Sequence, residues 1–283
     1  MYILYCPTGW VSKVVVFPLL RKYSYYLLSI LELLFGFDNP VLLARIFLNL
    51  AQPGIQIVRL RKRGLQFRVR GAMDVWSIKE TFLDRFYEKY GFTIQPHWKV
   101  IDIGAGLGDY TLYAAMTQLT SQVFSFEPYP ESFGLMQENL RLNAITNVQA
   151  FDQAIGAASG ELILDLSSGE PLQFQSQLKQ AVHVEKGLSV SSLSLVDALT
   201  KLGLESCDLL KLDCEGAEYA ILFGVPQPVL ERIQRIVMEY HDDPNQYSHA
   251  DLTRFLKESG FVVEIFPNPV HAHLGYLRAI RKN

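Results

Sequence analysis

The sequence is poor in cysteine and has no excess of either charge. Three cysteines, Cys6, Cys207 and Cys214, stand among 283 residues, and their spacing matches no zinc site or redox motif. A few dispersed cysteines are typical of a reducing compartment, so we expect a cytoplasmic protein. The 26 basic and 29 acidic side chains give a net charge of −3, which argues against a nucleic-acid binder and against a long acidic tail.

Long hydrophobic runs are also missing. The most apolar segment, residues 14–37, is interrupted by Pro18 and by charged residues such as Arg21 and Glu32. It therefore offers no stretch of about 18 uncharged apolar residues that would span a membrane. It also lacks the basic start, short apolar run and small-residue cleavage site of a secretory signal.

We predict a helical N-terminal extension over residues 1–54, and two interpretations of it stay open. In the first, its apolar helix faces pack against the main domain. In the second, Lys22, Tyr23, Tyr25 and Tyr26 form an interfacial belt that brings the protein to the membrane surface as a peripheral protein. The sequence does not decide between them.

Apolar and aromatic side chains are plentiful, at 49% and 12% of the chain, which is enough for a large core. Within residues 55–95, apolar and polar positions alternate on both sides of Gly64. This pattern predicts an amphipathic hairpin with a solvated cationic face, followed by a helix over 76–90. An anionic acceptor or lipid headgroup bound at that cationic face is the alternative.

From residue 96 onward the pattern changes to short apolar strands separated by helical segments. Such alternation is typical of βαβ units and a mostly parallel sheet. The segments VVEIFPN and HLGYLRAI near the C-terminus predict an antiparallel pair that ends the sheet. We therefore predict an α/β, Rossmann-like domain over residues 96–283.

A glycine-rich loop follows the first of these strands and contains Gly104, Gly106 and Gly108. Glycines between a strand and a helix let a ligand approach the backbone closely. The spacing G-x-G-x-G differs from the G-x-G-x-x-G of dinucleotide sites. Asp102 precedes the loop, where a carboxylate suits a cationic group better than a pyrophosphate. S-adenosylmethionine carries an ammonium and a sulfonium and no phosphate, so we expect it as the cofactor.

Two carboxylates at later strand ends are candidates for further cofactor contacts. Glu127 ends the second strand, 21 residues after Gly106, where it can accept hydrogen bonds from both ribose hydroxyls, each worth about 1.5–3 kcal/mol. A nicotinamide dinucleotide presents the same ribose, so Glu127 alone does not separate the two cofactors. Asp152 ends the third strand and is placed to meet an adenine edge.

Four segments, VIDIGAGLGDYTLYAA, FSFEPYPESFGLMQENLRLN, DLLKLDCEGAEYAIL and RIVMEYH, resemble the FkbM family of S-adenosylmethionine-dependent methyltransferases. The resemblance covers residues 75–265, and the K-x-D-x-E-G-A-E block is its most specific part. It implies a class I methyltransferase sheet, mostly parallel with an antiparallel last strand, and O-methylation of natural-product or sugar hydroxyls. Gly106 departs from the family pattern, which often has Asn there.

The second half of the chain supplies the candidate catalytic groups. In DLLKLD, Lys211 and Asp213 share one face of a strand that ends at Asp213. Ligands of open α/β sheets bind at the carboxyl ends of the strands, so Asp213 is expected to face the transferred methyl group. The strand RIVMEYH brings Glu239 and His241 to the same edge. Asp213 is our first choice for the group that positions the acceptor hydroxyl or acts as its general base. His241, whose ordinary pKa is nearest neutrality, is the second choice.

Simpler interpretations of these residues also stay open. Glu218 can cap a helix or pair with Lys211, and the segment after His241 can be a solvated loop. A divalent metal held by Asp213, Glu239 and His241 is chemically reasonable. The spacing does not demand one, so we predict no metal ligands.

The leading hypothesis is an S-adenosylmethionine-dependent methyltransferase that acts on a hydroxyl of a sugar, glycolipid or secondary metabolite. A Ser- and Gln-rich insertion over 161–190, predicted as a strand and a loop, can cover the small-molecule or glycan acceptor. The alternatives are a nicotinamide-dependent oxidoreductase and a non-catalytic module that binds the cofactor or a membrane surface. The sequence does not predict the oligomeric state.

Overall fold

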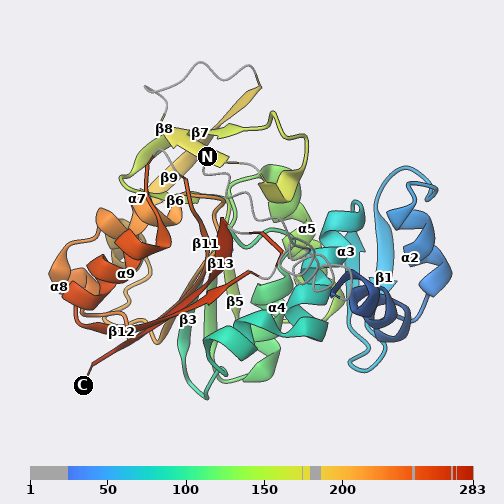
Figure 1. Cartoon of the computed structure of the whole chain (residues 1–283), viewed down its shortest axis with the longest axis horizontal. Coiled ribbons are helices and arrows are strands. Elements are labelled where there is room, and N and C mark those ends of the chain that lie inside the picture. The colour runs from blue at the N-terminus through green and yellow to red at the C-terminus, as the bar shows by residue number, and fades with distance from the viewer. Residues whose placement is uncertain are drawn as a thin grey trace, which may run out of the picture.

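The computed structural model describes residues 25–173, 175–178, 186–243, 246–268, 270–271 and 273–282 (Figure 1). Lys22 and Tyr23 of the predicted interfacial belt, and the start of the N-terminal extension, lie outside the described residues. Part of the predicted 161–190 loop lies outside them as well.

A seven-stranded sheet forms the centre of the structure, in the order β12-β13-β11-β10-β3-β4-β5. The five strands from β5 to β11 pair in parallel, and β13 pairs antiparallel with both β11 and β12. The predicted α/β fold, mostly parallel with an antiparallel end, is confirmed. The strands are β3 (Lys99–Ile103), β4 (Gln122–Phe126), β5 (Val148–Phe151), β10 (Leu209–Leu212), β11 (Arg235–His241), β12 (Phe261–Pro267) and β13 (Leu274–Arg281).

Helices cover both faces of this sheet, so its central strands are buried on each side. Val100 of β3 packs with α4 and α5, whereas its neighbour Ile101 packs with α6, α7 and α9 on the opposite face. Each strand therefore reads as a nearly continuous apolar run. The helices are α4 (Asp109–Thr117), α5 (Pro130–Leu142), α6 (Leu195–Lys201), α7 (Glu218–Phe223), α8 (Gln227–Leu230) and α9 (His249–Glu258).

A second, four-stranded sheet lies at one end of the central sheet, at the top of Figure 1. It has the order β6-β9-β7-β8 and is formed by β6 (Ala154–Gly156), β7 (Gly160–Asp165), β8 (Gln175–Leu178) and β9 (Gly187–Ser194). The strand predicted at the start of the 161–190 insertion is thus β7. A short helical turn, Pro171–Gln173, connects β7 toward β8.

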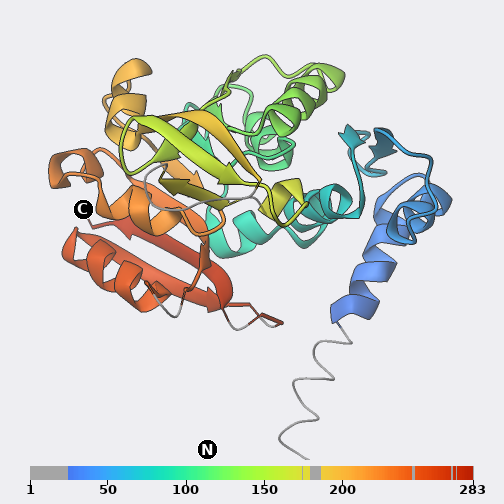
Figure 2. The ribbon, with the colours of Figure 1, turned by 90° about the horizontal axis from the view of Figure 1, so that it is seen from above.

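The N-terminal extension begins, in the described part, with a helix over 25–36, followed by α2 (Pro40–Phe47). The predicted hairpin is confirmed as the antiparallel pair β1 (Gln56–Arg59) and β2 (Gln66–Val69). The side chains of Asn139 and Asn143 on α5 accept hydrogen bonds from the backbone of β2, at 2.7 and 3.0 Å. These bonds attach the hairpin to the side of the main domain (Figure 2). The domain boundaries at residues 54 and 95 stay predictions.

The single helix predicted over 76–90 is wrong. A helix α3 (Ala72–Lys79) is followed by two wider, π-type turns, η1 (Glu80–Asp84) and η2 (Tyr87–Gly91), and Arg85 between them has φ = 57°. The wide turns and the left-handed residue change the direction of the chain. The spacing of apolar residues along the sequence does not reveal such a change.

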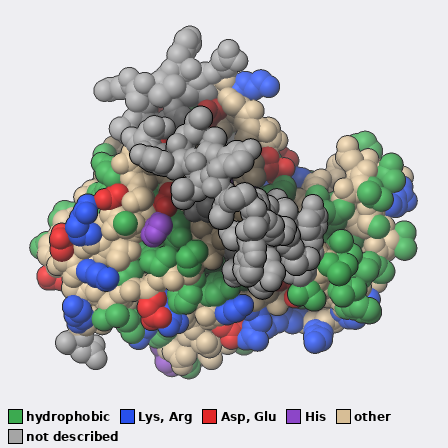
Figure 3. Space-filling model, viewed as in Figure 1, with side chains coloured by type: hydrophobic (Ala, Val, Ile, Leu, Met, Phe, Trp, Pro, Cys, Tyr) green, Lys and Arg blue, Asp and Glu red, His purple; other side chains and the backbone are tan. Residues whose placement is uncertain are grey.

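The helix over 25–36 has one packed side and one exposed side. Leu33 is buried and Glu32 pairs with the buried Lys79 at 3.1 Å, which supports the predicted packing against the main domain. Apolar side chains gather on the outer surface of the extension, at the right of Figure 3, and the exposed ones on this helix are Tyr26, Leu27, Leu28, Ile30, Leu31, Leu34 and Phe35. None of the helices in the described ranges has the length and apolar content to cross a bilayer.

Candidate active site

A cavity of about 840 Å³ opens at the carboxyl ends of the central strands. Ligands of open α/β sheets bind at this edge, and the volume is in the usual range for small-molecule sites. Four parts of the chain enclose it: the α3–η2 segment, the loops after β3, β4, β10 and β11, the small sheet, and the connection between β12 and β13. Its lining includes Trp76, Glu80, Tyr87, Gly104, Gly106, Asp109, Glu127, Leu172, Lys211, Asp213, Glu215, Glu239, His241 and Tyr276.

The three predicted loop glycines have different structural roles. All three have positive φ, but a Cβ on Gly104 would lie 1.8 Å from the carbonyl oxygen of Asp213, and one on Gly108 would lie 2.7 Å from Cγ of Met136. Gly104 is therefore required by the packing of β3 against the end of β10, and Gly108 by the packing of α5. Gly104 and Gly106 line the cavity, whereas Gly108 does not.

Glu127 stands at the cavity wall, as the sequence predicts for a cofactor contact. Its Oε2 accepts a hydrogen bond from the amide of Gly106 and its Oε1 from the amide of Tyr129, both at 2.8 Å. Burial raises the pKa of Glu127 to about 7, although the two amides favour the charged form. A carboxylate fixed in this way keeps further lone pairs for a ligand hydroxyl.

Asp102 lies under the cavity and is fully buried. Its Oδ1 is 3.0 Å from Nζ of Lys211, and its Oδ2 accepts a hydrogen bond from Thr111 at 2.6 Å. Lys211 therefore pairs with Asp102. Asp102 does not line the cavity. Its carboxylate pairs with the ammonium of Lys211, whereas the sequence predicted a cationic group of the cofactor as its partner.

Lys211 links residues at the ends of β3 and β10, at the base of the cavity. Its Nζ also donates to the carbonyl oxygen of Gly104 at 2.9 Å and lies 3.9 Å from Asp213. Burial alone would lower the pKa of Lys211, but Asp102, Asp213 and Asp109 raise it above its ordinary value. The ammonium is therefore charged and held by at least three acceptors.

Asp152 is exposed at the end of β5 and does not line the cavity. Its neighbour Gln153 bonds to Ser191 and Lys201 on the outer surface. The cavity wall at this point is apolar and comes from Phe126 and Ile155. A contact between Asp152 and an adenine edge stays a prediction that this geometry does not favour.

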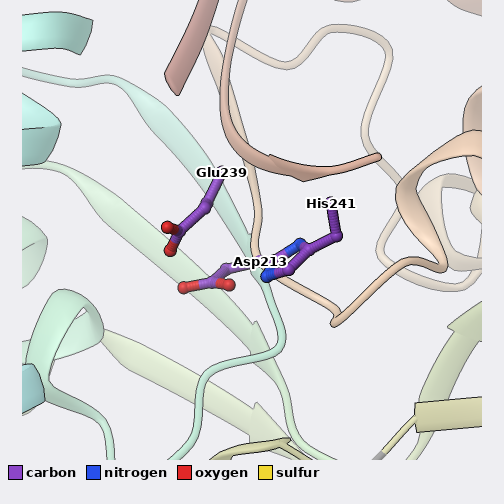
Figure 4. A group of neighbouring side chains, drawn as sticks. All are labelled: Asp213, Glu239 and His241. Atoms are coloured by element: carbon purple, nitrogen blue, oxygen red, sulfur yellow. The ribbon is translucent and has the colours of Figure 1, made fainter. Parts of the chain in front are cut away.

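Asp213, Glu239 and His241 meet at the cavity, as Figure 4 shows. One oxygen or nitrogen atom from each lies within 4.8 Å of the others. The parallel register pairs Leu212 of β10 with Met238 of β11, so the residues after them stand side by side. Glu239 and His241 are two positions apart on β11 and share a face. Oδ2 of Asp213 also accepts a hydrogen bond from the hydroxyl of Tyr87, at 2.6 Å.

More carboxyl groups line the cavity than the sequence analysis predicts. Burial raises the pKa of Glu80 to about 8 and that of Glu215 to about 7. Burial and repulsion from Asp213 raise the pKa of Glu239 above its usual range. Glu80 lies in the wide turn η1, and Glu215 has φ = 53°. Glu215 belongs to the K-x-D-x-E-G-A-E block, which could have indicated it, whereas no motif includes Glu80.

The surroundings of His241 shift its pKa away from the ordinary value near neutrality. Burial lowers that pKa, but Glu218, Glu215 and Glu239 raise it more, to about 10. A charged imidazolium cannot accept a proton. Asp213 is the better placed candidate base of the two.

The simpler interpretations are partly confirmed. Glu218 is fully buried and accepts hydrogen bonds from the amides of Cys214 and Gly216, at 2.6 and 2.9 Å, so it caps the turn before α7. Asp242 accepts hydrogen bonds from the hydroxyl of Tyr219 and the amide of His249. The segment after His241 is therefore tied to α7 and α9 and is not a freely solvated loop.

The topology, with its cavity at the strand ends and a carboxylate at the tip of β4, defines a Rossmann-like methyltransferase. Residues 102–263 match the family described as Methyltransferase FkbM domain, and the chain belongs to that family. It is 26% identical over 204 residues to "Methyltransferase 1" of Beauveria bassiana, covering 66% of this chain and 80% of the relative.

Two further relatives carry more specific names. The chain is 25% identical over 244 residues to "31-O-demethyl-FK506 methyltransferase FkbM" of Streptomyces tacrolimicus, covering 77% of this chain and 93% of the relative. It is 25% identical over 203 residues to "Hexuronic acid methyltransferase AglP" of Haloferax volcanii, covering 71% and 79%. The protein is an S-adenosylmethionine-dependent methyltransferase, which removes the oxidoreductase alternative.

The charges around the cavity fit this cofactor. Its walls carry the carboxyl groups of Glu80, Asp109, Glu127, Asp213, Glu215 and Glu239, whereas its cations are Lys211, which is already paired, and His241. Such a site attracts a sulfonium and an ammonium and repels a pyrophosphate. When bound, S-adenosylmethionine supplies a methyl group activated by the positive sulfur.

We expect Lys211→Met to destabilise the protein by about 3–5 kcal/mol, because it leaves the Asp102 carboxylate buried without its partner. Urea unfolding of the full chain measures the change. Arg254→Met, which removes the exposed pair with Asp251, is the control and should change the midpoint little. Equal stabilities of the two variants would show that the buried pair does not hold the sheet.

Proposed function

We propose that the enzyme methylates a hydroxyl oxygen of a sugar, glycolipid or secondary metabolite. The observation that carries this proposal is the position of Asp213, a carboxylate at the cavity end of β10 beside Glu239 and His241. A hydroxyl is a weak nucleophile and needs such a group to orient it or remove its proton. The names of two relatives, for a hexuronic acid and for a 31-O position, support an oxygen acceptor.

The chemistry is an in-line displacement. A bond forms between the acceptor oxygen and the methyl carbon while the carbon–sulfur bond breaks, and the hydroxyl proton leaves to a base. Holding the two reacting atoms in line accounts for about 7–11 kcal/mol of barrier reduction in such reactions. The hydrogen bond from Tyr87 and the ammonium of Lys211 fix the carboxylate of Asp213 for this task.

The cofactor side of the cavity is formed by the loop after β3 and the end of β4. We assign the ribose contact to Glu127, whose carboxylate is held by two backbone amides. Gly104 and Gly106 leave the backbone open beside it. Asp102 acts below them as a positioning residue, through Lys211.

Cofactor binding should depend on pH through Glu127. Ribose hydroxyls donate to a carboxylate, so binding favours the deprotonated form and affinity should increase as the pH rises through about 7. Calorimetric titration with S-adenosylhomocysteine from pH 6 to 8 measures this. Glu127→Gln should weaken binding by about 10- to 100-fold, the equivalent of a lost charged hydrogen bond, and flatten its pH dependence.

Glu131→Gln provides the matched control for Glu127, because Glu131 is an exposed acidic residue at the start of α5. It should retain both the wild-type affinity and the wild-type pH profile. A Glu127→Gln variant with the wild-type profile would remove Glu127 from the cofactor site.

Asp213→Asn should separate binding from chemistry. The amide oxygen can still accept the Tyr87 hydrogen bond, so the affinity for S-adenosylhomocysteine should stay within about threefold, whereas turnover should fall by about 10²–10⁴-fold. Transfer of labelled methyl groups to a panel of uronic acids, sugars and hydroxylated metabolites measures turnover. Full turnover in the variant would overturn the role of Asp213.

We also propose that the N-terminal extension contacts a membrane surface peripherally. Leu28, Leu31 and Phe35 follow one another at helical spacing and are 59%, 43% and 69% exposed. An exposed apolar stripe of this kind can insert into the interfacial region of a bilayer. It would place the enzyme beside a lipid-linked acceptor.

Sedimentation of the full chain with phospholipid vesicles tests this contact. The wild type should sediment with the vesicles, and Phe35→Ser should sediment much less. Leu119→Ser removes an apolar side chain that is 76% exposed outside the extension and should behave like the wild type. If all three proteins stay in solution, the membrane contact is refuted.

A further inference from the structure

The side chains of Asp213, Glu239 and His241 form a mixed oxygen and nitrogen donor set at the cavity edge (Figure 4). Divalent ions such as Mg²⁺ and Mn²⁺ bind carboxylates about 2.1 Å away, so adjacent ligand atoms of an octahedron lie about 3.0 Å apart and opposite ones about 4.2 Å apart. The three donor atoms lie within 4.8 Å of one another. A bound ion would draw them from these separations toward the shorter spacing.

Carboxyl groups around these donors outnumber the neighbouring cations, Lys211 and His241. Lys211 is 3.9 Å from Asp213 but is held closer by Asp102, at 3.0 Å. Glu215 adds another carboxylate, 3.4 Å from Nε2 of His241. Carboxylates crowded in this way are stabilised by a bound cation.

The environment of His241 supplies an independent indication. Its Nδ1 is enclosed without a hydrogen-bond partner, and the nearest charged group is Oε1 of Glu218, at 3.4 Å. Glu218 is itself fully buried and fixed by two backbone amides. A buried carboxylate behind an imidazole is the arrangement that orients metal-binding histidines and selects the ring nitrogen that stays free.

We propose that Asp213, Glu239 and His241 bind one divalent cation, which displaces the proton of His241, and that this cation holds the acceptor through two adjacent oxygens. The inference rests on the proposed O-methylation. Three protein ligands leave three positions of an octahedron for acceptor oxygens and water. The substrate class is then a vicinal diol, or a hydroxyl beside a carboxylate, as sugars and uronic acids present.

The cation would also activate the acceptor. A metal-bound hydroxyl loses its proton more readily, and the proton leaves to solvent water. The resulting oxygen anion forms the bond to the methyl carbon, and the carbon–sulfur electron pair returns to sulfur. The products are the methyl ether and S-adenosylhomocysteine.

Mn²⁺ titration of the full-length protein, stripped with a chelator, tests the site directly. Electron paramagnetic resonance counts free Mn²⁺, and we expect one ion bound per chain. Glu239→Gln and His241→Gln should each weaken Mn²⁺ binding at least about tenfold. Glu264→Gln, on the edge strand β12 and outside the cavity lining, should bind as the wild type does.

Calorimetry with S-adenosylhomocysteine on the same samples separates the two proposals, and circular dichroism identifies any variant that fails to fold. If S-adenosylhomocysteine binds but Mn²⁺ does not, the metal site is refuted and the methyltransferase remains. Equal Mn²⁺ binding by wild type, Glu239→Gln and His241→Gln would also refute it. Loss of Mn²⁺ binding in either folded variant, with the Glu264→Gln control intact, supports it.

Discussion

The buried ion pair between Lys211 and Asp102 is the interaction on which the active site depends. It joins β10 to β3, the two central strands whose ends form the floor of the cavity. The same ammonium holds the carbonyl of Gly104 and approaches Asp213. One side chain thus fixes the glycine loop on the cofactor side relative to the carboxylate on the acceptor side. A charge buried so deeply is tolerated because acceptors surround it.

A second constraint is the concentration of negative charge above that floor. Burial and mutual repulsion raise the pKa values of Glu80, Glu215 and Glu239, so the protein bears an electrostatic cost in the absence of a ligand. A cationic cofactor relieves that cost, and a divalent ion at the acceptor side would relieve it further. The same charges favour a sulfonium over a pyrophosphate.

The segment from α3 to η2 and the small sheet complete the site from two sides. The η1 and η2 turns bring Glu80 and Tyr87 to the cavity, while Leu172, after β7, lies 3.0 Å from the Cβ position of Gly106. Part of the cavity lining therefore comes from segments outside the parallel core.

The sequence by itself determined the α/β class, the parallel core with its antiparallel end, the glycine loop, Glu127 and the strand-end positions of Asp213, Glu239 and His241. Each depends on local periodicity or on the rule that parallel strands end at one edge. Only the tertiary structure decided that Asp102 forms an ion pair with Lys211, that Asp152 faces outward and that Glu80 lines the cavity. It also decided that His241 is charged near neutral pH. Partners, burial and pKa values depend on residues far apart in the chain, and no pattern along the sequence records them.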